Sequence, residues 1–190
     1  MKTLVYKITV IGDGAVGKTS LCARYMGKGF QKDYLGTIGA QVSVKEVKFE
    51  KKTFKFQIWD IAGQPSWGTL RDPYFNGAAG TLAVFDITRL ETFENIPKWI
   101  EKQWTTCNGP IPSILLGNKI DLRESFPMAI IPKQGKNLAR QLSKEGMKAE
   151  IEVSYLETCA KTGENVQEAF LLLAETILAQ VSKTSEFFSK

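Results

Sequence analysis

The chain has 190 residues, of which 43% are hydrophobic and 24% are charged, a balance that excludes a disordered or fibrous chain. It has no histidine and only three cysteines, Cys22, Cys107 and Cys159, whose spacing does not fit a metal site, which argues against zinc and favours a reducing compartment. The net charge of +5 comes from scattered basic residues, so we expect no nucleic-acid partner.

Predicted strands and helices alternate along the chain. Apolar runs predict strands near 3–11, 42–49, 53–60, 80–86, 112–117 and 151–157, and helical spacing predicts helices near 18–26, 67–76, 92–106, 133–146 and 165–181. The residues Glu50-Lys51-Lys52 predict a tight antiparallel turn, whereas the other connections contain helices. We therefore expect an α/β domain over 1–182, with a mostly parallel sheet, one antiparallel edge strand and helices on both faces, followed by a short tail at 183–190.

The first predicted strand leads into Gly12-Asp13-Gly14-Ala15-Val16-Gly17-Lys18-Thr19, which fits the phosphate-loop pattern G-x-x-x-x-G-K-[ST]. Its glycines allow the backbone to curl so that several N–H groups point inward. Lys18 adds a positive charge, and the Thr19 hydroxyl can bind Mg²⁺. The motif predicts a site for a nucleoside triphosphate.

A second motif, Trp59-Asp60-Ile61-Ala62-Gly63-Gln64, follows a predicted strand. We expect Asp60 to hold the Mg²⁺ shell through water and Gly63 to present its N–H to the γ-phosphate, because no Cβ blocks that approach. Gln64 is then placed to orient the attacking water.

A third motif, Asn118-Lys119-Ile120-Asp121, follows a buried apolar strand and reads N-K-x-D. The Asp121 carboxylate can accept two hydrogen bonds from guanine, while Asn118 and the stem of Lys119 hold the neighbouring loop and flank the ring. Adenine lacks that pair of donors and would leave the carboxylate unpaired. The motif therefore predicts GTP rather than ATP.

These motifs and the late segment Thr158-Cys159-Ala160-Lys161-Thr162 resemble the Ras-like small GTPases, and among them the Rab branch, over about residues 3–182. The resemblance implies the P-loop NTPase fold of a GTPase domain. It also implies that Thr37 is the switch I threonine that completes Mg²⁺ coordination, that Phe30 packs against guanine and that Tyr34 covers the phosphates. The loop containing Ala160 would contact guanine O6 through backbone N–H groups.

The predicted site has three groups of residues. The nucleotide contacts are Asp13, Gly14, Ala15, Val16, Gly17, Lys18, Thr19, Ser20, Phe30, Tyr34, Thr37, Gly63, Asn118, Lys119, Asp121, Leu122, Cys159, Ala160 and Lys161. The catalytic residues are Gln64, Lys18, Gly63 and Thr37. The Mg²⁺ contacts are Thr19, Thr37 and, through water, Asp60.

The chain departs from the family pattern most clearly in three places, besides mild changes elsewhere. Pro65 follows Gln64, where the family usually has Glu, and disfavours helical geometry at the glutamine. Val42 stands where Rab proteins carry the first aromatic of an effector-binding triad, although Trp59 and Tyr74 keep the other two. The end of the chain has no cysteine for prenylation, so no direct lipid anchor is evident. A truncated chain, recruitment to membranes by a partner, and action in solution stay open.

The resemblance implies a monomeric, cytoplasmic switch, with peripheral membrane association through partners as an alternative. Effectors, exchange factors and GTPase-activating proteins would bind through switch I (30–40) and switch II (62–76). No arginine precedes Thr37 in switch I, so we expect slow hydrolysis of GTP to GDP. One alternative is a guanine-nucleotide-binding scaffold that hardly hydrolyses GTP, which is compatible with Pro65, although the retained Gln64 favours the switch. Another is a phosphate-loop kinase, which N-K-x-D disfavours.

Two surface segments allow two interpretations each. Lysines gather on the predicted hairpin at Lys45, Lys48, Lys51, Lys52 and Lys55, which fits a solvated edge strand or a contact surface for an acidic partner or lipid. The segment 122–131 is unusually apolar for a loop. It either packs against its own domain or forms a contact site.

Overall fold

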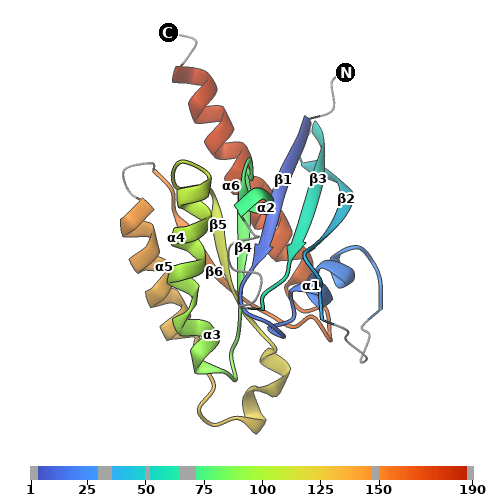
Figure 1. Ribbon diagram of the computed structural model, residues 1–190, viewed down its shortest axis with the longest axis vertical. Helices are drawn as coiled ribbons and strands as arrows, with labels where there is room; N and C mark the ends of the chain where they lie inside the picture. Colours follow the sequence, from blue (N-terminus) through green and yellow to red (C-terminus); the bar gives the residue numbers. More distant parts are fainter. Residues whose placement is uncertain (1–3, 30–35, 50–51, 65–71, 147–149, 188–190) are drawn as a thin grey trace.

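The computed structural model describes residues 4–29, 36–49, 52–64, 72–146 and 150–187 (Figure 1). It contains a six-stranded sheet in the order β2-β3-β1-β4-β5-β6. The strands are β1 (Leu4–Ile11), β2 (Ala40–Phe49), β3 (Lys52–Ile61), β4 (Gly80–Asp86), β5 (Ser113–Asn118) and β6 (Val153–Thr158). Within the described part of the chain, only β2 pairs antiparallel, to β3, and the remaining pairs are parallel. The predicted fold class is confirmed.

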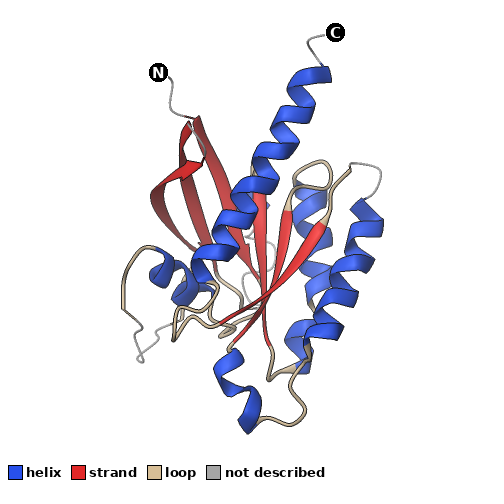
Figure 2. Cartoon of the chain, turned by 180° about the vertical axis from the view of Figure 1, so that it is seen from behind, coloured by secondary structure: helices blue, strands red, loops and turns tan. Residues whose placement is uncertain are grey.

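Helices cover both faces of the sheet (Figure 2). Among the described residues, the α-helices are α1 (Lys18–Tyr25), α2 (Asp72–Phe75), α3 (Leu90–Glu94), α4 (Ile96–Thr106), α5 (Pro132–Gly146) and α6 (Val166–Phe187). One apolar cluster joins α1 and α6 to the sheet, and a second joins α2, α4 and α5 to its other face. Every residue of β4 and β5 is buried, as expected for parallel strands covered on both faces.

The parallel strands end at the same edge of the sheet, which lies at the lower end of Figure 1. The segment after β1, the start of α1 and the segments after β5 and β6 gather there. Ligands of open parallel sheets bind at this edge. The fold therefore brings the three sequence motifs to one place.

The helices differ from the prediction in several places. The helix predicted near 92–106 is two helices, since Pro97 lacks the N–H that would continue the hydrogen-bond ladder of α3 into α4. The helix predicted near 165–181 runs on to Phe187, and the 3₁₀ helix η3 (Ile120–Ser125) was not predicted. Of the helix predicted near 67–76, only α2 lies within the described residues.

The apolar segment 122–131 is partly buried and partly exposed. Ala129 and Ile130 are buried, whereas Phe126, Met128 and Ile131 are exposed. Its backbone is tied to the domain, because Ile130 N–H donates to the carbonyl of Ile87. The segment thus packs against its own domain through two residues and presents three apolar side chains to solvent.

Candidate functional site

The segment between β1 and α1 is a tightly turned loop. Gly12, Ala15 and Gly17 have φ values of 130°, 60° and 99°, in the left-handed half of the backbone map. A Cβ at Gly12 would lie 2.1 Å from the carbonyl oxygen of Val84, and one at Gly17 would lie 2.3 Å from Nδ2 of Asn118. Glycine is therefore required at both positions, and α1 begins directly after the loop, with its first N–H groups at this end of the helix.

Lys18 places its ammonium group inside this loop. Its Nζ donates to the backbone carbonyls of Gly12 at 2.8 Å and Asp13 at 2.7 Å, and only 6% of the residue is exposed. A buried cation held by carbonyl groups is suited to an anionic ligand.

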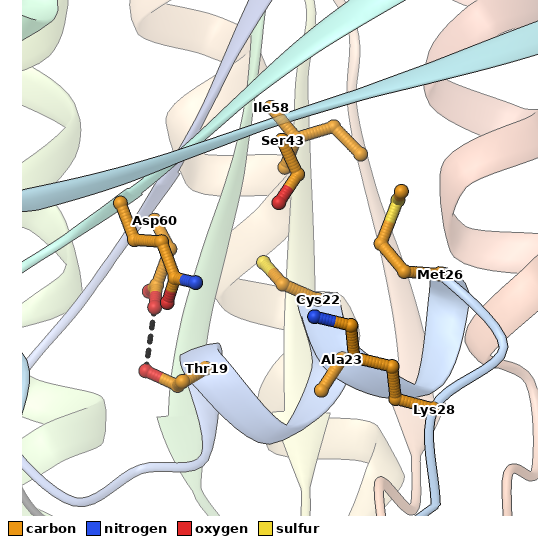
Figure 3. Close-up of a pocket in the computed structure, with 9 residues that line it drawn as sticks. Thr19, Cys22, Ala23, Met26, Lys28, Ser43, Ile58 and Asp60 are labelled. Atoms are coloured by element: carbon orange, nitrogen blue, oxygen red, sulfur yellow. Dashed lines mark hydrogen bonds between the residues drawn. The ribbon is translucent and has the colours of Figure 1, made fainter.

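Three oxygen-bearing side chains meet beside the loop. Oγ1 of Thr19 donates to Oδ2 of Asp60 at 2.5 Å (Figure 3) and lies 2.8 Å from Oγ1 of Thr37. Asp60 is 3% exposed, and its Oδ1 has no hydrogen-bond partner among the described residues. Burial raises the pKa of this carboxyl group, while the Thr19 hydrogen bond and the charge of Lys18 oppose that shift.

This oxygen cluster fits Mg²⁺. Hydroxyl and carboxylate oxygens are the donors that hard divalent cations prefer, and a cation shell would satisfy the unpaired Asp60 oxygen. A pocket extends from the cluster between α1 and the β2–β3 hairpin (Figure 3). It is lined by Thr19, Cys22, Ala23, Met26, Lys28, Gln41, Ser43, Ile58 and Asp60.

Asn118 joins two of the predicted binding loops. Its Nδ2 donates to the carbonyl of Val16 at 2.8 Å, and its Oδ1 accepts from the N–H of Ala160 at 3.2 Å and the hydroxyl of Thr158 at 3.3 Å. The asparagine is 1% exposed. Its amide therefore fixes the spacing between the phosphate loop and the 158–162 loop.

The other two polar residues of N-K-x-D are also held in place. Lys119 has a φ of 71°, and its Nζ lies 2.7 Å from Oδ2 of Asp86 at the end of β4. Oδ1 of Asp121 accepts from the Cys159 thiol at 3.2 Å, and Oδ2 lies 3.4 Å from Nζ of Lys161. The carboxylate therefore faces the 158–162 loop, as a base pocket built from both segments requires.

Gly63 and Gln64 lie against the phosphate loop. A Cβ at Gly63 would lie 2.3 Å from the carbonyl carbon of Asp13, so glycine allows this approach. A Cβ at Gly14 would lie 3.7 Å from Cγ of Gln64, an ordinary contact, and one at Gly36 would lie 2.9 Å from Nε2 of the same glutamine. Gln64 is thus placed between the phosphate loop and switch I.

A family model described as Ras family matches residues 7–179. The chain belongs to the Ras family. It is 37% identical over 175 residues to Ras-related protein Rab-10 of Diplobatis ommata, an alignment that covers 92% of this chain and 82% of the relative. It is 35% identical to human Ras-related protein Rab-8B, covering 94% and 81% of the two chains, and 37% identical to RABA4b of Arabidopsis thaliana, covering 94% and 75%. The resemblance to the Rab branch of these GTPases is confirmed.

Some predicted positions of this Ras family member lie outside the described residues, namely Phe30, Tyr34 and Pro65, within the segments 30–35 of switch I and 65–71 of switch II. The three positions that the Rab resemblance assigns to an effector-binding triad lie within the described residues. Val42 pairs with Trp59 across β2 and β3, and the rings of Trp59 and Tyr74 have centroids 6.0 Å apart. With 43% of Val42 exposed, the three residues share one surface on which valine replaces an aromatic side chain.

Sequence reasoning missed three residues that hold the phosphate loop. Oδ1 of Asp13 accepts from the indole N–H of Trp99 at 2.7 Å, and its Oδ2 accepts from Nδ2 of Asn95 at 2.9 Å. Nη2 of Arg89 donates to the carbonyl of Gly14 at 2.8 Å. These partners are 75 to 86 positions apart in the chain, so no local sequence pattern could have paired them.

Among the described residues, no helix combines the length and the apolar character that crossing a bilayer requires.

Proposed function

We propose that this Ras family member is a switch that binds GTP and GDP with Mg²⁺ and slowly hydrolyses GTP to GDP. The observation that carries the proposal is the cluster of Thr19, Thr37 and Asp60, in which one hydroxyl lies within 2.8 Å of the other two side chains. These residues come from the phosphate loop, switch I and the end of β3. A ligand that holds this cluster therefore determines the position of switch I.

The phosphates would occupy the loop between Gly12 and Thr19. Lys18 would transfer its hydrogen bonds from the carbonyls of Gly12 and Asp13 to phosphate oxygens, which carry more charge. Thr19, Thr37 and, through water, Asp60 would hold Mg²⁺, which neutralises charge on the β- and γ-oxygens when bound. Gly63 lies against the loop backbone, and its N–H would contact the γ-phosphate.

Guanine would bind between the N-K-x-D segment and the 158–162 loop. Asp121 would exchange its weak contacts to Cys159 and Lys161 for the N1–H and N2 amine of guanine. Asn118 keeps both loops at a fixed spacing through the Ala160 N–H, and backbone N–H groups of the Ala160 loop would contact guanine O6. Leu122, Cys159 and Lys161 complete the base site that we propose.

Gln64 would position the attacking water in this site. Its placement beside Gly14 and Gly36 supports that role, because water activation requires a side chain between the phosphate loop and switch I. Loss of the γ-phosphate would remove the ligands that hold Thr37 and Gly63. Partners that contact switch I (30–40) and switch II (62–76) would read that change.

Membership in the Rab branch supports a role in membrane trafficking. We propose that the chain works as a monomer in the cytoplasm with effector, exchange-factor and GTPase-activating proteins. Membrane association would come through such partners, and nucleic acid is not a partner.

Single-turnover hydrolysis of preloaded GTP with Mg²⁺ tests the proposal. We expect slow turnover by the parent and a loss of about 10²-fold in Gln64→Leu, since leucine cannot orient water. Fast hydrolysis by Gln64→Leu would contradict the role of the glutamine.

Pro65 next to Gln64 favours the second candidate function, a guanine-nucleotide-binding scaffold. In the same assay, a parent that binds GTP but leaves it intact, with turnover restored in Pro65→Glu, would establish that scaffold.

A further inference from the structure

Arg89 connects the start of α3 to the phosphate loop. Its Nη2 donates to the carbonyl of Gly14 at 2.8 Å, and its Nε lies 3.3 Å from Oδ2 of Asp86. A third contact, from Nη1 to Oε1 of Glu91, is longer at 3.7 Å, and that carboxylate is largely exposed. The guanidinium therefore makes two close contacts, one of which is to the loop backbone.

The carboxylate of Asp86 holds this guanidinium in place. Its side chain is 2% exposed, Oδ1 accepts from the N–H and hydroxyl of Thr88, and Oδ2 lies 2.7 Å from Nζ of Lys119 as well as close to Arg89. Burial alone would raise the pKa of this carboxyl group, but the contacts with Lys119 and Thr88 outweigh it and lower the pKa. A charged carboxylate thus fixes Arg89 and the lysine of N-K-x-D together.

The contact to Gly14 matters because of peptide geometry. In a planar trans peptide, the C=O of one residue and the N–H of the next point in opposite directions. A guanidinium that holds the Gly14 oxygen on the α3 side therefore turns the N–H of Ala15 the other way. Ala15 has a φ of 60°, an uncommon conformation for a residue with a side chain, and the hydrogen bond from Arg89 to the Gly14 carbonyl helps to hold this peptide.

We propose that Arg89 is a positioning residue that sets the orientation of the Gly14–Ala15 peptide and so strengthens binding of the β-phosphate. It acts through the loop backbone and does not itself contact the nucleotide. This inference rests on the proposed function, because it presupposes a nucleotide in the phosphate loop. It assigns a phosphate-specific role to a side chain outside all three binding motifs.

The test compares GDP with GMP, which shares the base, ribose and α-phosphate but lacks the β-phosphate. Affinities are measured with Mg²⁺ by competition against a fluorescent GDP, for the parent, Arg89→Gln, Arg89→Lys and the matched control Glu91→Gln. In Arg89→Gln we expect GDP affinity to fall by about tenfold, the effect of losing one hydrogen bond from a charged group, while GMP affinity stays unchanged. Arg89→Lys keeps a charge beside Asp86 and should recover part of the loss.

Glu91→Gln removes only the 3.7 Å contact and should bind both nucleotides like the parent. An equal loss of GDP and GMP affinity in Arg89→Gln would indicate a general structural role and overturn the proposal, as would unchanged GDP affinity. A parent that binds neither nucleotide would instead refute the proposed function. The two failures are therefore distinguishable.

Discussion

At the scale of single residues, Asp60 is the side chain of the site whose burial is most costly. A carboxylate that is 3% exposed, with one oxygen unpaired among the described residues, is costly, and burial accordingly raises its pKa. The Thr19 hydroxyl and the charge of Lys18 offset only part of this cost. A divalent cation would stabilise the ionised form, so the fold carries a local cost that ligand binding can remove.

Tyr25 gives a prediction about alkaline pH. The residue is 4% exposed, its ring stacks on Phe170 with centroids 3.7 Å apart, and burial raises the pKa of its hydroxyl to about 12. Unfolding exposes the phenol, which then ionises near pH 10. Between pH 10 and about 12 the unfolded state has thus released a proton that the folded state keeps, so stability falls as pH rises.

We therefore expect Tyr25→Phe to match the parent at pH 8 and to exceed its free energy of unfolding above pH 10, by about 1.4 kcal/mol per pH unit up to about pH 12. Phenylalanine keeps the stacked ring but has no group to ionise. Urea unfolding of both proteins in excess GDP, at pH 8, 10 and 11, measures the difference. Parallel loss of stability in the two proteins would show that Tyr25 is not responsible.

The residues of the site differ in how far the sequence predicts them. Lys18, Asn118 and Asp121 belong to spaced motifs whose chemistry is local, and the structure brings them to one edge of the sheet. Arg89, Asn95 and Trp99 act on a loop more than 70 positions away. Such pairings depend on how β1, β4 and α4 are placed relative to one another. Local sequence motifs do not reveal that placement.

At the scale of elements, α5 is packed onto β6 through a glycine. A Cβ at Gly135 would lie 2.3 Å from the Cε2 and Cζ atoms of Tyr155. We expect Gly135→Ala to lower the free energy of unfolding by about 1–3 kcal/mol through overpacking, although alanine is the better helix former by about 1 kcal/mol. Thermal and urea unfolding in excess GDP measure this loss.

A second substitution tests the stated cause. Adding Tyr155→Leu should shrink the effect of Gly135→Ala, because the obstructing ring is gone and the two changes are then coupled. Gly29→Ala serves as the control, since its Cβ would meet no atom within 4 Å. Additive effects of Gly135→Ala and Tyr155→Leu would contradict the packing argument.

The sequence predicts the bounds of an element well where a long hydrophobic pattern defines it. It predicts them poorly where a single residue or a tertiary contact sets the boundary. The strand bounds differ from the predicted ones by at most two residues at each end, because buried parallel strands are continuous apolar runs. The division between α3 and α4 lies next to Pro97, which lacks the N–H that would continue the helix. The 3₁₀ helix η3 depends on the tertiary setting of the segment after Lys119, whose left-handed backbone no periodicity reveals.

At the scale of the whole molecule, the binding site connects segments that are remote in the chain. Thr37 from switch I, Asp60 from β3 and Asn118 from β5 all contact the phosphate loop or the start of α1. A nucleotide with Mg²⁺ would tie these segments together only in the folded state. Ligand binding should therefore raise the free energy of unfolding of the whole domain, in addition to ordering the switch segments.

We predict that GDP with Mg²⁺ raises the unfolding temperature by about 5–15 °C. A ligand at about 100 to 1,000 times its Kd adds about 2.7–4.1 kcal/mol to the free energy of unfolding. The unfolding temperature of a domain of this size rises by about 2–4 °C for each kcal/mol. Chelating Mg²⁺ with EDTA should remove part of that shift. Calorimetry measures it, with ADP as the control ligand, because adenine cannot satisfy Asp121. Asp60→Asn should keep the response to GDP but lose the part that depends on Mg²⁺. An equal shift with ADP would contradict the base-recognition argument, and an Mg²⁺ response unchanged in Asp60→Asn would remove this carboxylate from the metal site.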